Sequence, residues 1–208
     1  MKILAVSDEV VERLYNLCAC GHFSDVELIL GCGDLPYPYL ENLLTFLNIP
    51  LLYVPGNHDP IYNPETPLAH VEGGSNLDLK LTRYKRFLIG GFGGSIRYRP
   101  EGVNQYTQKQ MYTRMVRLLP DMIWNYYKGV RLDILVTHSP PLGIHDDDDL
   151  AHTGFAALRD FIRWFKPRYL LHGHTMFYKQ NLVEPVTQVG ATKIVNVYPY
   201  RVFELEVQ

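Results

Sequence analysis

One stretch of this 208-residue chain constrains its fold more than any other: the sequence Gly-Asn-His-Asp at residues 56–59. It follows an apolar run, residues 49–55, that is typical of a buried strand ending in a loop. An amide, an imidazole and a carboxylate therefore stand together at a strand end. In an open α/β sheet, ligands bind in the crevice beyond the carboxyl ends of the strands. The stretch thus indicates a chemical site.

Polar residues follow other strand-like runs in the same manner. These runs are residues 2–7, 27–33, 132–137 and 168–171, and the residues that follow them are Asp8, Asp34, His138, His172 and His174. Because the carboxyl ends of parallel strands meet at one edge of a sheet, we expect these side chains to gather there.

The order of strand-like and helical patterns predicts an α/β fold. Strands are expected at 2–7, 26–30 and 51–54, alternating with helices near 10–20 and 37–48, which is the pattern of βαβ units. Further on, residues 77–81 and 87–94 are typical of an antiparallel pair, and helices are expected within 106–128 and 153–165. Residues 182–207 alternate again, with Gly190 in a hairpin and a last strand from Tyr200 to Val207.

Taken together, the motifs resemble those of the calcineurin-like metallophosphoesterase family. They are Asp8, Gly33-Asp34, Gly56-Asn57-His58-Asp59, Thr137-His138 and Gly173-His174, and the resemblance extends from residue 2 to about residue 206. It implies a single domain over residues 1–208, built as a four-layer α-β-β-α sandwich. Two mixed sheets would be flanked by helices, with two divalent metals at the strand carboxyl ends.

The resemblance also implies which residues hold the metals. Asp34 would bridge the two ions, and the second metal site would take Asp34, Asn57, His138 and His174. Two neighbouring ions can clamp the attacking and leaving oxygens of an in-line displacement at phosphorus. Mixed oxygen and imidazole ligands suit manganese, iron or zinc.

The first metal site departs from the family pattern, because Val10 and Met176 stand where the family usually has histidine. Valine has no donor atom, and a thioether is a poor ligand for such ions. Asp8 and the shared Asp34 remain. Either the site is empty or other residues replace the missing ligands. The candidates are Glu9, His22, His145, His152, His172 and the run Asp146–Asp149. We therefore expect one tightly held ion and a much weaker second one.

Substrate contacts follow from the same resemblance. His58 would lie over the metals and protonate the leaving alkoxide, while Asp59 would hold its ring in place. Arg97 and Arg99 follow a glycine-rich loop, where a guanidinium group could bind a substrate phosphate. The alternative interpretation is that both arginines are solvated surface residues.

The amino-acid composition of the chain indicates which classes of binding partner to expect. Lys and Arg total 20 against 22 Asp and Glu, a formal net charge of −2, which argues against a broad nucleic-acid surface. No run of 18 apolar residues and no charged leader is present, and three cysteines predict a reducing compartment. We expect a cytoplasmic protein that binds a small phosphate ester and no membrane. The sequence leaves the oligomeric state open.

Two functions fit these features. The first is hydrolysis of a phosphomonoester or phosphodiester by a metal-bound hydroxide, as the resemblance implies. The alternative is a non-catalytic or weakly active scaffold that keeps the fold and binds a partner. The complete ligand set of the second metal site favours the hydrolase.

Overall fold

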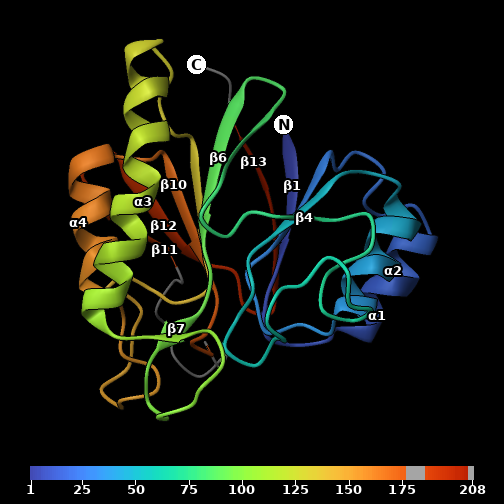
Figure 1. The fold of residues 1–208 in the computed structure, drawn as a ribbon. Helices are drawn as coiled ribbons and strands as arrows, with labels where there is room; N and C mark the ends of the chain where they lie inside the picture. Colours follow the sequence, from blue (N-terminus) through green and yellow to red (C-terminus); the bar gives the residue numbers. More distant parts are fainter. Residues whose placement is uncertain (177–185, 206–208) are drawn as a thin grey trace.

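A computed structural model describes residues 1–176 and 186–205 and shows a mixed α/β fold in four layers (Figure 1). Two sheets pack against each other, and helices cover their outer faces. The helices over the first sheet are α1 (Glu12–Ala19) and α2 (Tyr37–Leu47), and those over the second are α3 (Gln108–Tyr127) and α4 (Ala156–Phe165). The predicted sandwich of two mixed sheets flanked by helices is confirmed.

The first sheet is mostly parallel and has the strand order β13-β1-β2-β3-β4. Its strands are β1 (Lys2–Val6), β2 (Leu28–Gly31), β3 (Leu51–Tyr53), β4 (Ser75–Asn76) and β13 (Tyr200–Glu204). Strands β1 to β4 run parallel, and β13 pairs antiparallel with β1. The continuous apolar runs of β1 and β2 follow from this position, because strands covered on both faces need no polar side.

The second sheet has the order β11-β12-β10-β9-β6-β5. Its strands are β5 (Leu81–Tyr84), β6 (Phe87–Phe92), β9 (Ile134–Thr137), β10 (Tyr169–His172), β11 (Val186–Val189) and β12 (Thr192–Asn196). The central four strands are parallel and the two edge strands are antiparallel. A short pair, β7 (Ser95–Ile96) with β8 (Gln105–Tyr106), lies beyond the end of β6.

Three apolar layers hold the sandwich together. Between the sheets, Leu30 of β2 and Val136 of β9 belong to one buried cluster. Leu43 of α2 packs in the cluster on the outer side of the first sheet, and Phe161 of α4 in that of the second. Each sheet therefore buries both faces, which leaves the strand ends as the places where polar residues can meet.

The antiparallel pair differs from its prediction. The sequence predicts a strand at 77–81, whereas β5 begins at Leu81. Asp78 instead forms one bridge with Gly91, and its carboxylate accepts hydrogen bonds from Gly93 N (2.7 Å) and Arg114 Nη2 (2.7 Å). These contacts tie residues 77–80 to α3 and to the loop after β6. The expected strand positions 182–185 and 206–207 lie outside the described residues.

Cys18, Cys20 and Cys32 are free thiols, and two of them are buried. Among residues 1–176 and 186–205, no helix combines the length and the apolar character needed to cross a membrane.

Candidate metal centre

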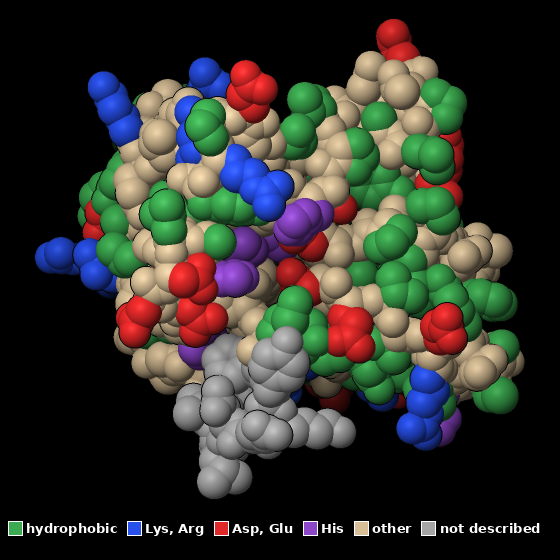
Figure 2. All heavy atoms as spheres, turned by 90° about the horizontal axis from the view of Figure 1, so that it is seen from below, with side chains coloured by type: hydrophobic (Ala, Val, Ile, Leu, Met, Phe, Trp, Pro, Cys, Tyr) green, Lys and Arg blue, Asp and Glu red, His purple; other side chains and the backbone are tan. Residues whose placement is uncertain are grey.

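The candidate site lies where the carboxyl ends of strands from both sheets meet. Asp8 and Asp34 follow β1 and β2 of the first sheet, and His138 and His174 follow β9 and β10 of the second. Viewed from this end, histidine side chains gather near the middle of the face, with acidic side chains beside them (Figure 2). The structure thus brings these four predicted residues together.

Left-handed backbone turns direct three of these side chains into the site. Asp8, Asp34 and His174 have φ angles of 64°, 55° and 67°. Such conformations cost a non-glycine residue about 1–3 kcal/mol and persist only where surrounding contacts enforce them. Here the backbone N–H of His174 donates to Asp8 Oδ2 (2.9 Å), and that of Asp34 donates to Asp59 Oδ2 (2.9 Å). The side chains of one loop therefore hold the turn of another.

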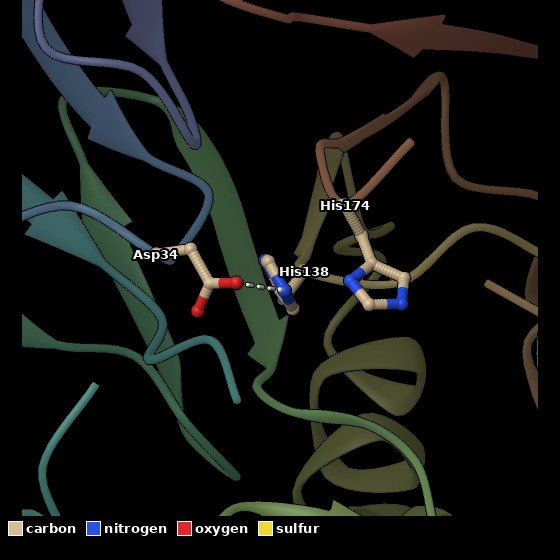
Figure 3. Close-up of side chains that lie close together, drawn as sticks. All are labelled: Asp34, His138 and His174. Atoms are coloured by element: carbon tan, nitrogen blue, oxygen red, sulfur yellow. Dashed lines mark ion pairs between the residues drawn. The ribbon is translucent and has the colours of Figure 1, made fainter. Parts of the chain in front are cut away.

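Asp34, His138 and His174 form a compact group, because each offers a ligand atom within 4.8 Å of the others (Figure 3). His138 Nε2 lies 3.2 Å from Asp34 Oδ2 and 3.1 Å from Asn57 Oδ1. Asn57 Nδ2 donates to the hydroxyl of Tyr98 (3.3 Å), which leaves the amide oxygen facing His138. The four residues predicted for the second metal site therefore converge.

The hydrogen bonds of His138 explain why a cation suits this position. Its Nδ1 lies 2.8 Å from the carbonyl oxygen of Cys32, which can only accept, so Nδ1 carries a proton. Nε2 then faces two oxygen acceptors. Burial lowers the pKa of His138, but the Asp34 carboxylate outweighs it and raises the pKa to about 10. A bound divalent ion would replace that second proton, so the donor set fits a metal.

Asp34 and His174 have the protonation states that ligands need. Burial raises the pKa of Asp34, yet the charge and hydrogen bond of His138 bring it down to about 2. Burial and the neighbouring His138 lower the pKa of His174 to about 3. Its Nε2 lies 2.8 Å from the Ala151 carbonyl, so the other nitrogen, Nδ1, keeps its lone pair. Figure 3 shows one ring nitrogen of His174 turned toward His138.

The first metal position keeps fewer donors. Asp8 accepts hydrogen bonds from the Ser7 hydroxyl and from His174 N, and burial raises its pKa. Val10 is 40% exposed, and Met176 is 50% exposed at the rim of the hollow above Asp34. The family histidines therefore have no equivalent at these two positions.

The candidate replacements lie in different places. His152 lines the same hollow as His174, with the ring centroids 5.1 Å apart, and pairs with Asp149 at 2.7 Å. Glu9 accepts a hydrogen bond from the Tyr198 hydroxyl. The remaining pairs are His145 with His172 (2.9 Å between Nδ1 and Nε2) and His22 beside Phe23. Of these candidates, His152 is the one that lines the hollow within the described part of the chain.

Asp59 makes backbone contacts that its predicted role does not include. The sequence suggests that it holds the His58 ring, whereas its Oδ2 accepts hydrogen bonds from Gly56 N (2.7 Å) and Asp34 N (2.9 Å). Burial and the Asp34 carboxylate raise its pKa to about 6, although these backbone N–H groups oppose the rise. Asp59 therefore joins the loops after β2 and β3.

Two adjoining hollows open above the ligand group. One, of about 420 Å³, is lined by Asp8, Asp34, Asn57, His58, Tyr98, Arg99, Ala151, His152, His174 and Met176. The other, of about 860 Å³, shares Asn57, His58, Tyr98 and Arg99 with it. Arg99 lies over the Tyr98 ring, with its guanidinium carbon 5.3 Å from the centroid. Arg97 is not among the residues that line either hollow, and it donates to the Gln105 carbonyl (3.0 Å).

Sequence reasoning missed residues that support the site. Asn104 Nδ2 donates to the carbonyls of Gly56 (2.9 Å) and Asp59 (3.1 Å) and so holds the loop after β3. Tyr98 orients Asn57, and Ala151 orients His174 through its backbone carbonyl. No motif marks these positions, because each acts through a contact between distant segments.

Comparison with known proteins identifies the family of this chain. The model of the calcineurin-like phosphoesterases matches residues 1–178. The chain belongs to the calcineurin-like phosphoesterase family. The chain is 26% identical over 218 residues to MJ1162, an uncharacterized protein of Methanocaldococcus jannaschii, covering 98% of this chain and 90% of the relative.

Solved structures share the fold of this member of the calcineurin-like phosphoesterase family. The protein TT1561 of Thermus thermophilus superposes with a TM-score of 0.61 at 20% identity, over 94% of this chain and 88% of that one. The sulfate thiohydrolase SoxB of Thermus thermophilus, solved with glycerol, gives 0.51 at 14% identity, over 94% of this chain and 51% of that one. At these identities the likeness concerns the fold alone.

We predict that Gly56→Ala weakens metal binding. An added Cβ would overlap Asp34 Oδ1 and lie 2.6 Å from Asp34 N, so the loop must move away from the ligand group. We expect metal affinity to fall at least about 10-fold, measured by equilibrium dialysis with elemental analysis. The control is Gly190→Ala, where a Cβ meets nothing within 4 Å and only left-handed strain of about 1–2 kcal/mol is added. Equal metal loss in both variants would contradict this account.

Proposed function

We propose that this protein is a metal-dependent hydrolase of phosphate esters. The observation that supports it is the convergence of Asp34, Asn57, His138 and His174 at the seam of the two sheets, where His138 Nε2 faces two oxygen atoms and His174 Nδ1 keeps its lone pair. Oxygen and imidazole donors suit manganese, iron or zinc. We propose one tightly bound ion at this position.

The residues around the metal ligands would have different roles in the reaction. Bound divalent ions would neutralise charge on the phosphoryl group and lower the pKa of a bound water. His58 is exposed and lines both hollows, and its backbone N–H donates to Asp34 Oδ1 (2.8 Å). From there its imidazole could contact phosphoryl oxygens and protonate the leaving alkoxide. Asp59 and Asn104 hold the loop that presents His58.

The hollows favour a small phosphate ester as substrate. Arg99 lines both of them and is the guanidinium group positioned to bind a phosphate. Phosphoryl transfer requires mainly positioning and charge neutralisation from the protein. The site therefore fits a phosphomonoester or a small phosphodiester.

A non-catalytic or weakly active binding protein is the competing proposal. The exposed Val10 and Met176 favour it, because they remove two donors from the first metal position. The two proposals differ in whether purified protein hydrolyses nitrophenyl phosphate mono- or diesters when supplied with metal.

We predict that Asn57→Ala and His174→Ala each abolish metal-dependent hydrolysis and leave the fold intact. Each change removes one donor from the complete ligand set. Hydrolysis, metal content and thermal unfolding of each variant would be measured together. Matched controls are Asn125→Ala and His22→Ala, which alter a half-buried and an exposed side chain, both outside the hollows. Wild-type turnover with unchanged metal content in either site variant would show that the ligands are misassigned.

We predict that His58→Ala lowers turnover and spares metal content. Loss of a positioned proton donor typically costs about 10²–10⁴-fold in rate. Turnover should fall less with a nitrophenyl ester than with an alkyl ester, since nitrophenolate leaves without a proton. A variant that loses its metal but is fully active in excess metal would instead make His58 a ligand.

We predict that Val10→His combined with Met176→His raises the occupancy of a second metal. Wild-type protein should hold one tight ion per chain, because water completing a coordination shell adds no chelate advantage. Turnover should rise with occupancy if the first position limits activity. Elemental analysis that finds two equally tight ions in the wild type would contradict this prediction and point to His152 as a replacement ligand.

A further inference from the structure

A basic cavity lies at the other end of the second sheet. Its volume is about 680 Å³, within the range of about 300–1,000 Å³ typical of small-molecule sites. Among the described residues that line it, six carry a positive charge and one a carboxylate. The cations are Arg83, Arg86, Arg131, Lys166, Arg168 and Lys193, and the carboxylate is Asp133.

The topology separates this cavity from the metal centre. Asp133 and Arg168 stand directly before β9 and β10, whereas His138 and His174 follow the same strands. Lys193 pairs with Tyr169 at the start of β10. Four strand residues rise roughly 13 Å, so about that length of sheet lies between the two places. In Figure 1, β6 runs downward toward β7, so the amino ends of the parallel strands β6, β9 and β10 lie toward the top, opposite to the face seen in Figure 2.

The positive charge of the cavity is local. The whole chain has a formal net charge of −2, so this excess of cations is compensated elsewhere on the protein. Asp133 lies 3.8 Å from Arg168 and also accepts a hydrogen bond from Leu88 N (2.9 Å). Among the described residues that line the cavity, Asp133 is the one carboxylate beside six cations. An anion with several charges would relieve their mutual repulsion, and arginine favours phosphate because its fork matches two oxygens.

An apolar hollow of about 430 Å³ adjoins the basic cavity. The two share Val130, Arg131, Leu132 and Lys166. Aromatic residues of α3 and α4 line the hollow, including Tyr126 (69% exposed) and Trp164 (56% exposed). Large aromatic side chains exposed beside cations are typical of surfaces that bind a partly apolar anion.

We propose that the basic cavity and the apolar hollow together bind a nucleoside polyphosphate. Its linked phosphates would lie among the cations, and its base would stack against the aromatic side chains of the hollow. A single phosphate could contact only a few of the six cations, which favours a ligand with two or three linked phosphates. A concave cavity fits a small molecule better than the extended track that a nucleic-acid backbone needs. This site is independent of the metal centre and of the hydrolysis proposed there.

The first experiment locates binding by charge reversal. Calorimetry on the full-length protein at about 0.15 M salt would use the non-hydrolysable nucleotide β,γ-methylene-ATP. Arg131→Glu with Lys193→Glu changes two exposed cavity residues, and Lys109→Glu with Arg117→Glu makes the same change of net charge on the exposed surface of α3. We expect one nucleotide per chain, with affinity at least 10-fold lower in the cavity variant and within twofold of wild type in the control.

Three results would overturn the proposal. The first is the absence of saturable binding in the wild type. The second is equal weakening in both double variants, which would reflect net charge only. The third is binding that the cavity variant keeps and Asn57→Ala loses, which would place the nucleotide at the metal centre.

A second experiment tests whether the base of the nucleotide binds in the apolar hollow. The chain has two tryptophans, so Trp124→Phe leaves Trp164 as the single fluorophore of that kind. We expect the nucleotide to change Trp164 fluorescence and inorganic tripolyphosphate to bind more weakly without that change. Equal affinity for both, with no change in fluorescence, would overturn the placement of the base. Binding of single-stranded oligonucleotides without binding of the mononucleotide would replace the proposal with a nucleic-acid site.

Discussion

The imidazole of His138 joins the two sheets at the point where the candidate metal centre lies. It follows β9 of the second sheet, and its two nitrogens contact the Cys32 carbonyl and the Asp34 carboxylate, which follow β2 of the first. The ring has no exposed surface. Because both nitrogens are held, a shift of one sheet against the other would separate the ligand atoms. The packing of the sandwich and the geometry of the centre therefore depend on the same contact.

Close approach of backbone segments makes that contact available. A Cβ at Gly33 would lie 2.6 Å from His138 Nδ1 and 2.7 Å from Gly56 N, so only glycine lets the loops after β2 and β3 and the imidazole come this near. Asp59 and Asn104 then hold the loop with side-chain hydrogen bonds. The centre is thus supported by backbone geometry as much as by its ligands, which is the condition for a preorganised site.

The second sheet carries opposite charge patterns at its two ends. At the carboxyl ends of its strands, histidines meet carboxylates of the first sheet and create a place for cations. At the amino ends, arginines and lysines surround a cavity suited to anions. The sheet between them is apolar, so each end can keep its own electrostatic environment. In the two proposals made above, both ends bind phosphate groups, one through a metal ion and the other through cationic side chains.

The sequence by itself determined the fold class and the strand-end positions of Asp8, Asp34, His138 and His174, because hydrophobic periodicity and strand-end motifs are local patterns. It missed the true start of β5, since the contacts of Asp78 with Gly93 and Arg114 are not local. Only the tertiary structure decided the protonated nitrogen of His138, the bracing role of Asp59 and the different positions of Arg97 and Arg99. It also brought together cations spread from Arg83 to Lys193. The physical reason is the same in each case: these features depend on distances between segments that only the packing of the two sheets sets.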